Sequence, residues 1–279
     1  MMGPLRLLIS DVDGTLLRSD KSLGPPVITA VRRLMASGVE VALISARPPS
    51  GMLWLANELG LSHAMAAFNG GTLVGQDGAI LAVSRLPLQV ATRAWDSLER
   101  PAIVRWLFSA GRWYTQSADG HHADRERVTT RQEPCVRSDF SDLLAEADKI
   151  VAVSDDPSAL DDLESELTQT LGKEATVMRS QSYYLDITAL DANKGHGVMA
   201  LAARANIDLA NVAVIGDQCN DLPMFAKAGL SIAMGQAPGA VRAAADCVTL
   251  SNDDDGLATA INDVLFPLIE PPRRTRGPA

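Results

Sequence analysis

The stretch Leu5-Arg-Leu-Leu-Ile-Ser-Asp-Val-Asp-Gly-Thr-Leu16 decides the fold. Its first half is a short apolar run, typical of a buried strand, and this run ends abruptly at Asp11. Asp11 and Asp13 therefore lie in a loop at the carboxyl end of the strand, where Gly14 supplies the bend. Because open α/β sheets bind ligands beyond the carboxyl ends of their strands, both carboxylates stand where a binding site is expected.

The segments that follow repeat a strand–helix–strand pattern. After the first strand we expect a helix that opens at Pro25 and closes at Gly38, a strand over 39–44, a helix over 52–59 and a strand over 64–68. Such units with apolar strands predict a parallel sheet with helices on both faces. The residues 72–74 and 79–83 flank Gly75-Gln-Asp-Gly78 and predict a hairpin.

From about residue 85 to about residue 189 the regular strand–helix alternation is replaced by a mixed order of strands and helices. This stretch predicts helices over 89–98 and 157–171, strands over 103–108, 113–115, 149–153, 175–179 and 184–188, and an exposed polar loop over 119–131 that holds His121 and His122. After Lys194 the first pattern resumes with helices over 196–205, 222–228, 241–245 and 256–268 and strands over 212–216, 231–234 and 248–250. We therefore predict an α/β fold, with a Rossmann-like parallel core (residues 1–84 and 190–279), an inserted α+β cap (residues 85–189) and a frayed tail over 271–279.

Composition and charge set limits on function. The chain has 279 residues, of which 47% are hydrophobic, and carries 25 Lys and Arg against 34 Asp and Glu, a net charge of −9. This negative charge argues against nucleic acid or an anionic membrane as the main partner, but a bound cation would still allow a small phosphorylated substrate. Three scattered cysteines indicate reduced thiols and a cytoplasmic location, and no apolar run reaches the roughly 18 residues of a membrane span.

A second acidic group, Gly216-Asp-Gln-Cys-Asn-Asp221, follows another apolar strand. Taken alone, Asp221 is explained as a helix N-cap and the Asp11–Asp13 loop as an Asx turn. A calcium loop is a poor alternative because its glycine and glutamate positions are not matched here. Acidic groups at two strand ends of one sheet instead indicate a hard divalent cation, and ligation by oxygen alone favours Mg²⁺.

These motifs, taken in order, resemble those of the haloacid dehalogenase (HAD) superfamily phosphatases, and more narrowly the Cof-type group with a large cap. The resemblance rests on Asp11-Val-Asp-Gly-Thr15, Ser45-Ala-Arg47 after the second strand, Lys194, and Gly216-Asp-Gln-Cys-Asn-Asp221, with Asn69-Gly70, residues 228–235 and residues 251–256 matching later parts of the pattern. The sequence departs from the pattern in two places. Ser45-Ala46 stands where Thr-Gly is more frequent, and Ser45 keeps the hydroxyl donor. Gln236 stands where an asparagine is usual.

The resemblance implies a role for each matched residue. Asp11 would attack phosphorus and form an aspartyl-phosphate, and Asp13 would act as general acid and then as general base. Mg²⁺ would be held by Asp11, the main-chain carbonyl of Asp13 and Asp217, with Asp221 supporting it directly or through water. The phosphate would bind Ser45, Lys194 and Asn220, where Asn220 orients either Lys194 or the phosphate. Arg47, Asn69 and Gly70 would form the loops that face the substrate.

The implied function is a Mg²⁺-dependent phosphatase for a small soluble phosphomonoester, with sugar phosphates as the leading class. Two alternatives stay open: a phosphotransferase or phosphomutase of the same superfamily, and a catalytically silent protein that binds a phosphorylated metabolite. We expect a monomer or a weak homodimer. The cap would select the leaving group, and its residues match no specific motif.

Overall fold

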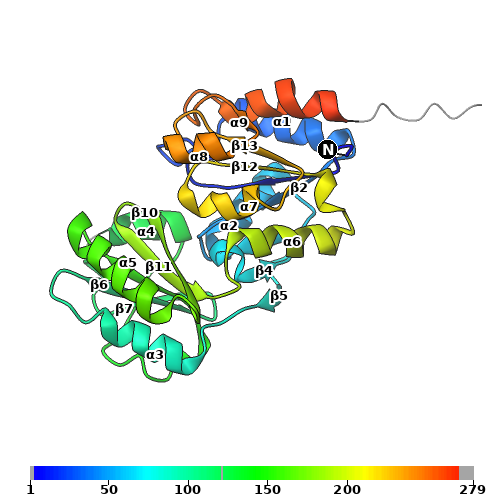
Figure 1. Ribbon diagram of the computed structural model, residues 1–279. Coiled ribbons are helices and arrows are strands. Elements are labelled where there is room, and N and C mark those ends of the chain that lie inside the picture. Colours follow the sequence, from blue (N-terminus) through cyan, green and yellow to red (C-terminus); the bar gives the residue numbers. More distant parts are fainter. Residues whose placement is uncertain (1–2, 121, 270–279) are drawn as a thin grey trace, which may run out of the picture.

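A central parallel sheet organises the first and last parts of the chain (Figure 1). The computed structural model describes residues 3–120 and 122–269, so His121 and the predicted frayed tail lie outside the described residues. The strands run in the order β14-β13-β12-β1-β2. β1 lies between β12 and β2 and pairs in parallel with both. Their bounds are β1 Leu7–Ser10, β2 Glu40–Leu43, β12 Val212–Gly216, β13 Leu230–Ala233 and β14 Cys247–Val248.

Helices cover both faces of this sheet, as the apolar strands predicted. In β1, Leu8 packs into the cluster formed with α1 and α2, whereas Leu7 and Ile9 pack into the cluster formed with α6 and α8. Every residue of β1 is buried, which explains why Leu7, Leu8 and Ile9 are all apolar rather than alternating with polar residues. The helices are α1 Pro25–Ala36, α2 Ser50–Leu59, α6 Lys194–Ala205, α7 Leu222–Phe225, α8 Gly239–Ala244 and α9 Gly256–Thr259.

The last helix is less regular than the sequence predicted. α9 passes at Ala260–Leu265 into a π-helical turn and at Phe266–Leu268 into a 3₁₀ turn. A small antiparallel sheet, β3 Met65–Ala67, β4 Thr72–Val74 and β5 Ile80–Val83, adjoins the core. Its β4–β5 hairpin confirms the one predicted around Gly75-Gln-Asp-Gly78.

A second, mainly antiparallel sheet occupies the middle of the chain and lies beside the core in Figure 1. Its order is β10-β11-β9-β6-β7-β8, with a single parallel pair between β7 and β8. The bounds are β6 Val104–Ser109, β7 Arg112–Thr115, β8 Cys135–Val136, β9 Ala147–Val153, β10 Ala175–Gln181 and β11 Tyr184–Ala189. The mixed architecture confirms the predicted α/β class with an inserted α+β part, while the division at residues 84/85 and 189/190 stays a proposal.

Two helices cover the outer face of this sheet and a third lies on the other side. α3 Leu88–Ser97 and α5 Pro157–Leu171 pack through Val90, Leu163 and Leu167 onto β6, β9 and β11. The opposite face buries Trp106 and Phe108, and the Phe108 ring contacts Phe68 of the core at 5.5 Å. That face also holds α4 Ala123–Thr130, a helix in the stretch that the sequence predicted as a loop. The inner face of the second sheet is therefore the one turned towards the core.

Two findings bear on the environment of the chain. Among the described residues no helix is both long and apolar enough to cross a bilayer. The three cysteines are all free thiols. The cytoplasmic location and the oligomeric state stay predictions from the sequence.

Candidate active site

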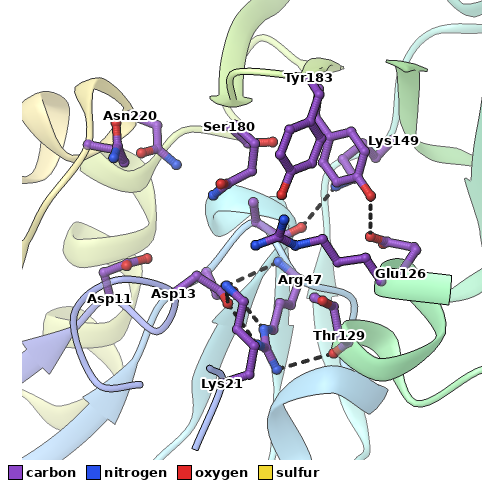
Figure 2. A pocket seen from close by; sticks show the side chains of 16 residues that line it. Asp11, Asp13, Lys21, Arg47, Glu126, Thr129, Lys149, Ser180, Tyr183 and Asn220 are labelled. Atoms are coloured by element: carbon purple, nitrogen blue, oxygen red, sulfur yellow. Dashed lines mark hydrogen bonds and ion pairs between the residues drawn. The ribbon is translucent and has the colours of Figure 1, made fainter. Parts of the chain in front are cut away.

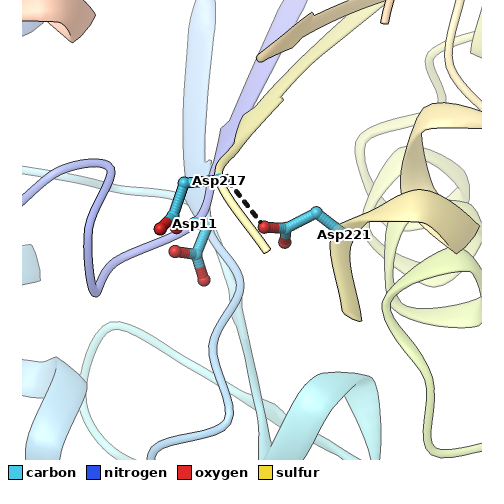
Figure 3. Close-up of side chains that lie close together, drawn as sticks. All are labelled: Asp11, Asp217 and Asp221. Carbon is cyan, nitrogen blue, oxygen red and sulfur yellow. Dashed lines mark hydrogen bonds between the residues drawn. The ribbon is translucent and has the colours of Figure 1, made fainter. Parts of the chain in front are cut away.

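Two neighbouring strand ends bring three aspartates together. Asp11 follows β1, Asp217 follows β12, and Asp221 closes the 3₁₀ turn after β12. One carboxylate oxygen from each lies within 4.8 Å of the other two, and all three side chains are buried (Figure 3). Gly14 permits this approach, because its φ of 84° is unfavourable for other residues and a Cβ there would collide with the Asp217 carboxylate.

Lys194, the first residue of α6, lies between two of these carboxylates. Its Nζ donates to Asp11 Oδ1 at 2.5 Å and to Asp221 Oδ1 at 2.6 Å, and the side chain is 1% exposed. Burial alone would lower the pKa of Lys194, but the two carboxylates raise it above the ordinary value. The lysine is therefore held as a cation inside the acidic cluster.

The cluster still carries more negative than positive charge. Burial raises the pKa of Asp11, although Lys194 opposes the shift, and the Asp221 and Asp217 charges add to it. Burial likewise raises the pKa of Asp217, with Asp221 as the next contribution. Three buried carboxylates and one ammonium group leave an excess that a hard cation would balance. The all-oxygen donor set and the short separation fit Mg²⁺, which identifies the residues suited to hold it.

Asp221 has a structural task as well. Its Oδ2 accepts the backbone N–H groups of Asp217 and Gln218, both at 2.8 Å. It does not cap α7 through its side chain, contrary to the simple N-cap explanation. Asp221 thus accepts three bonds of 2.6–2.8 Å. Asp217 accepts two longer bonds of 3.2 Å, from Thr15 and Gln218, and Asp11 accepts one from Lys194, so Asp11 and Asp217 are the less engaged carboxylates of the cluster.

Asp13 is not part of the cluster of three aspartates and forms ion pairs with two cations (Figure 2). Lys21 Nζ lies 2.6 Å from its Oδ1, and Arg47 Nε lies 2.7 Å from its Oδ2. Burial would raise the pKa of Asp13, but the bonds and charges of Arg47 and Lys21 hold it well below its usual range. Arg47 was expected in this region from its place after β2, whereas nothing in the sequence distinguished Lys21.

The loops after β2 and β3 are tied to each other. The Asn69 N–H donates to the Ser45 carbonyl at 2.8 Å, and the Phe68 N–H donates to the Arg47 carbonyl at 3.0 Å. Gly70 has a φ of 99°, and a Cβ there would collide with the Asn193 carbonyl at the start of α6. These contacts bring the predicted substrate loops and the Lys194 helix to one edge of the sheet.

Asn220 and Gln236 make contacts that the sequence did not reveal. Asn220 Nδ2 donates to Asn69 Oδ1 at 3.2 Å, so the described contacts link Asn220 to the substrate loop rather than to Lys194. Gln236 Nε2 donates to the Gly14 carbonyl at 2.6 Å, and its Oε1 accepts the Asn252 N–H. Gln236 thus supports the loop that carries Asp11 and Asp13.

A cavity of roughly 600 Å³, including space open to solvent, lies between this site and the second sheet (Figure 2). Asp11, Asp13, Ser45, Arg47 and Asn220 line its core half. Its other half comes from α4, β9 and the β10–β11 turn, through Arg125, Glu126, Thr129, Lys149, Ser180, Gln181, Tyr183 and Tyr184. Sequence reasoning named none of these cap residues. His122, which the sequence predicted to lie in an exposed loop, stacks on Tyr183 and does not line the cavity.

Buried polar groups shape the cap half. The Tyr184 hydroxyl donates to Glu126 Oε2 at 3.2 Å, and burial raises the pKa of Glu126 to about 7. Lys149 Nζ donates to the Ala46 carbonyl at 3.0 Å and lies 3.4 Å from Asp186 Oδ2. A carboxyl group, a hydroxyl group and an ammonium group thus face the same space as Asp11 and Asp13.

A parallel core, an inserted cap and a buried acidic cluster at the strand ends are the features of a hydrolase with a Rossmann-like core and a cap. The chain belongs to the haloacid dehalogenase-like hydrolases, since the model of that family matches residues 8–261. This confirms the family indicated by the sequence motifs.

Relatives support the same assignment. A putative phosphatase of Haemophilus influenzae is 26% identical over 266 residues, which cover 92% of this chain and 97% of that protein. The HMP-PP phosphatase of Cronobacter sakazakii is 28% identical over 232 residues, covering 83% and 85%. A crystal structure of a haloacid dehalogenase-like hydrolase from Bacteroides thetaiotaomicron has 28% identity and a TM-score of 0.81, covering 92% and 98%. The prediction of an enzyme of the phosphatase kind is thereby confirmed.

Proposed function

We propose that the protein is a Mg²⁺-dependent phosphatase that hydrolyses a small phosphomonoester through an aspartyl-phosphate on Asp11. The observation that carries this proposal is the buried cluster of Asp11, Asp217 and Asp221 around Lys194 at adjacent strand ends. Asp11 and Asp217, with the Asp13 main-chain carbonyl, would hold the cation, and Asp221 would support it. When bound, Mg²⁺ would offset carboxylate charge and stabilise the charge on the phosphate oxygens.

The chain's own groups supply the remaining chemistry. An Asp11 oxygen attacks phosphorus, and the bond from phosphorus to the leaving oxygen breaks as that oxygen takes a proton from Asp13. Water then attacks the aspartyl-phosphate, Asp13 takes its proton, and Asp11 is regenerated as phosphate leaves. Lys194 and the Ser45 hydroxyl would stabilise the phosphate oxygens from the other side.

Asp13 must change its partners during this sequence. Arg47 and Lys21 hold it as a carboxylate, which is the form that activates water in the second step. To protonate the leaving group in the first step, Asp13 must first bind a proton. We therefore expect the entering phosphate to compete with Asp13 for these two cations.

The leaving group is proposed to be small and hydroxylated, such as a sugar or a similar metabolite. Support comes from the hydrogen-bonding groups of the cap half, among them Glu126, Ser180 and the Tyr184 hydroxyl. The name of the Cronobacter relative records a small phosphorylated metabolite as its substrate.

A phosphate-release assay over a broad panel of phosphorylated metabolites tests the proposal. Wild type should release phosphate with Mg²⁺ and not with EDTA, and Asp11→Asn should abolish turnover while it still binds substrate. Asp162→Asn, on the exposed face of α5, is the matched control and should keep full activity.

The same assay separates the alternatives. Transfer of the phosphoryl group to a second hydroxyl without free phosphate would indicate a phosphomutase. Binding without turnover in wild type would indicate a silent binding protein. Either result would overturn the hydrolase proposal.

A further inference from the structure

One cation in the cavity differs from the others in its partners. Within the described part of the chain four cationic side chains line the cavity, and three of them have carboxylate partners: Lys21 and Arg47 on Asp13, and Lys149 near Asp186. Arg125, the fourth, has no carboxylate partner among the described residues and contacts the ring of Tyr183. Its charge is therefore available to a ligand.

The contact of Arg125 with Tyr183 is made to the aromatic ring and uses none of the hydrogen-bond donors of the guanidinium group. Arg125 Cζ lies over the Tyr183 ring, 5.2 Å from its centroid. The side chain of Arg125 donates no hydrogen bond to another described residue, so its N–H groups are free, and the planar fork of a guanidinium group suits the two oxygens of a carboxylate or phosphate.

The surroundings hold this pair in place. The Tyr183 ring stacks on His122 at 4.0 Å and 9°, and His122 Nε2 lies 2.7 Å from Asp155 Oδ1. His122 immediately precedes α4, the helix that carries Arg125. At the other end of α4, the Thr129 carbonyl accepts a bond from Arg47. Both ends of α4 are therefore held in place, the first by contacts within the cap and the last by Arg47 in the loop after β2.

Glu126 follows Arg125 but does not neutralise it. Adjacent helical residues point in different directions, and Glu126 is buried against the Tyr184 hydroxyl while Arg125 is exposed. Burial also raises the pKa of Glu126 to about 7, so near neutral pH it carries only part of a negative charge. The cap half thus offers an unpaired cation beside a group that bonds hydroxyls.

We propose that Arg125 binds a second anionic group on the leaving group of the substrate, a carboxylate or a second phosphate. The inference rests on the proposed phosphatase function and narrows its substrate class to phosphorylated sugar acids or sugar bisphosphates. The phosphate to be removed lies against Asp11 in the core half, and the acidic end of the leaving group lies in the cap half against Arg125.

Matched pairs of esters test this assignment. D-Gluconate 6-phosphate and D-glucitol 6-phosphate differ in a carboxylate, and glucose 1,6-bisphosphate and glucose 6-phosphate differ in a phosphate. Wild type should have the higher kcat/KM for the acidic member of at least one pair, and the responding pair identifies the anion. Arg125→Gln should lower kcat/KM for that member by roughly 10- to 100-fold, the effect of losing a charge-assisted contact, and leave the neutral member unchanged.

Arg131→Gln is the control. Arg131 stacks on Trp54 at 4.2 Å just after α4 and does not line the cavity, so both members should be hydrolysed as by wild type. Equal loss on acidic and neutral esters in Arg125→Gln, or a wild-type preference for neutral esters across the panel, would overturn the inference while leaving the phosphatase proposal intact. Failure of wild type to release phosphate from any ester would instead refute the proposed function itself.

Discussion

Replacing Lys194 with methionine tests how the acidic cluster is held together. Lys194 forms two short bonds, to Asp11 at 2.5 Å and to Asp221 at 2.6 Å, and is 1% exposed. Methionine retains much of the apolar stem, so the main change is the loss of charge. Removing one partner of a buried ion pair costs about 3–5 kcal/mol, because the remaining charge stays buried without compensation.

The cost should depend on pH in a defined direction. Burial raises the pKa of Asp11 to about 8 and that of Asp217 to about 6, and Lys194 opposes both shifts, so both pKa values should be higher in the variant. Below about pH 8 the difference between variant and wild type comes from Asp217, because its wild-type pKa is about 6. A carboxyl whose pKa is higher in the folded than in the unfolded state binds more protons when folded, and the fold loses stability as pH rises between the two values. Lys194→Met should therefore be closer to wild type at about pH 5 than at about pH 8.

Thermal unfolding in EDTA, followed by circular dichroism, measures the effect. A loss of about 3–5 kcal/mol corresponds to a fall of roughly 6–20 °C in Tm. Lys227→Met, at an exposed lysine just after α7, is the control and should melt with wild type. If Lys194→Met unfolded within about 2 °C of wild type at both pH values, the lysine would not be the main charge that offsets these carboxylates.

Two further variants probe the metal cluster and the cap separately. Mg²⁺ should stabilise wild type by mass action, by about 2.7 kcal/mol at 100 times Kd, and so raise its Tm. Asp217→Asn should lose this rise in Tm. An unchanged rise in Asp217→Asn would show that Asp217 is not part of the metal site. Burial raises the pKa of Glu126 to about 7, so wild type loses stability as pH rises from the ordinary glutamate range through 7. Glu126→Gln removes that penalty, so the Tm of the variant minus the Tm of wild type should be larger at about pH 8 than at about pH 5. A Tm difference that does not change with pH would contradict the raised pKa of Glu126.

The core was predictable because its signals are local and repeated. β1 and β12 are short, apolar and buried on both faces, and each ends at an aspartate, so the strand ends and their carboxylates follow from the sequence. Parallel neighbours then bring Asp11 and Asp217 to one edge without further information. The positions of Asp11 and Asp217 depend on this local pattern, whereas Lys194, at the start of α6, was singled out only by the resemblance of the motifs.

The cap half was not predictable, because its signals are weak. α4 buries Ala123, Glu126 and Thr130, so it has no apolar face by which a helix could be recognised. Lys21 likewise sits in a loop, with a φ of 67°, and reaches Asp13 only through the fold of that loop. Such residues are placed by tertiary contacts, and their roles become visible only in three dimensions.

Three such contacts join the cap to the loop after β2 and to the first residue of α2. Arg47 Nη1 donates to the Thr129 carbonyl, Ser50 Oγ donates to the Thr130 carbonyl, and Lys149 Nζ donates to the Ala46 carbonyl. The same Arg47 holds Asp13 through two further nitrogens. A shift of α4 relative to the core would therefore break a bond of the guanidinium group that also positions the proposed acid and base. Because one side chain serves both contacts, the position of the cap and the geometry of Asp13 are not independent.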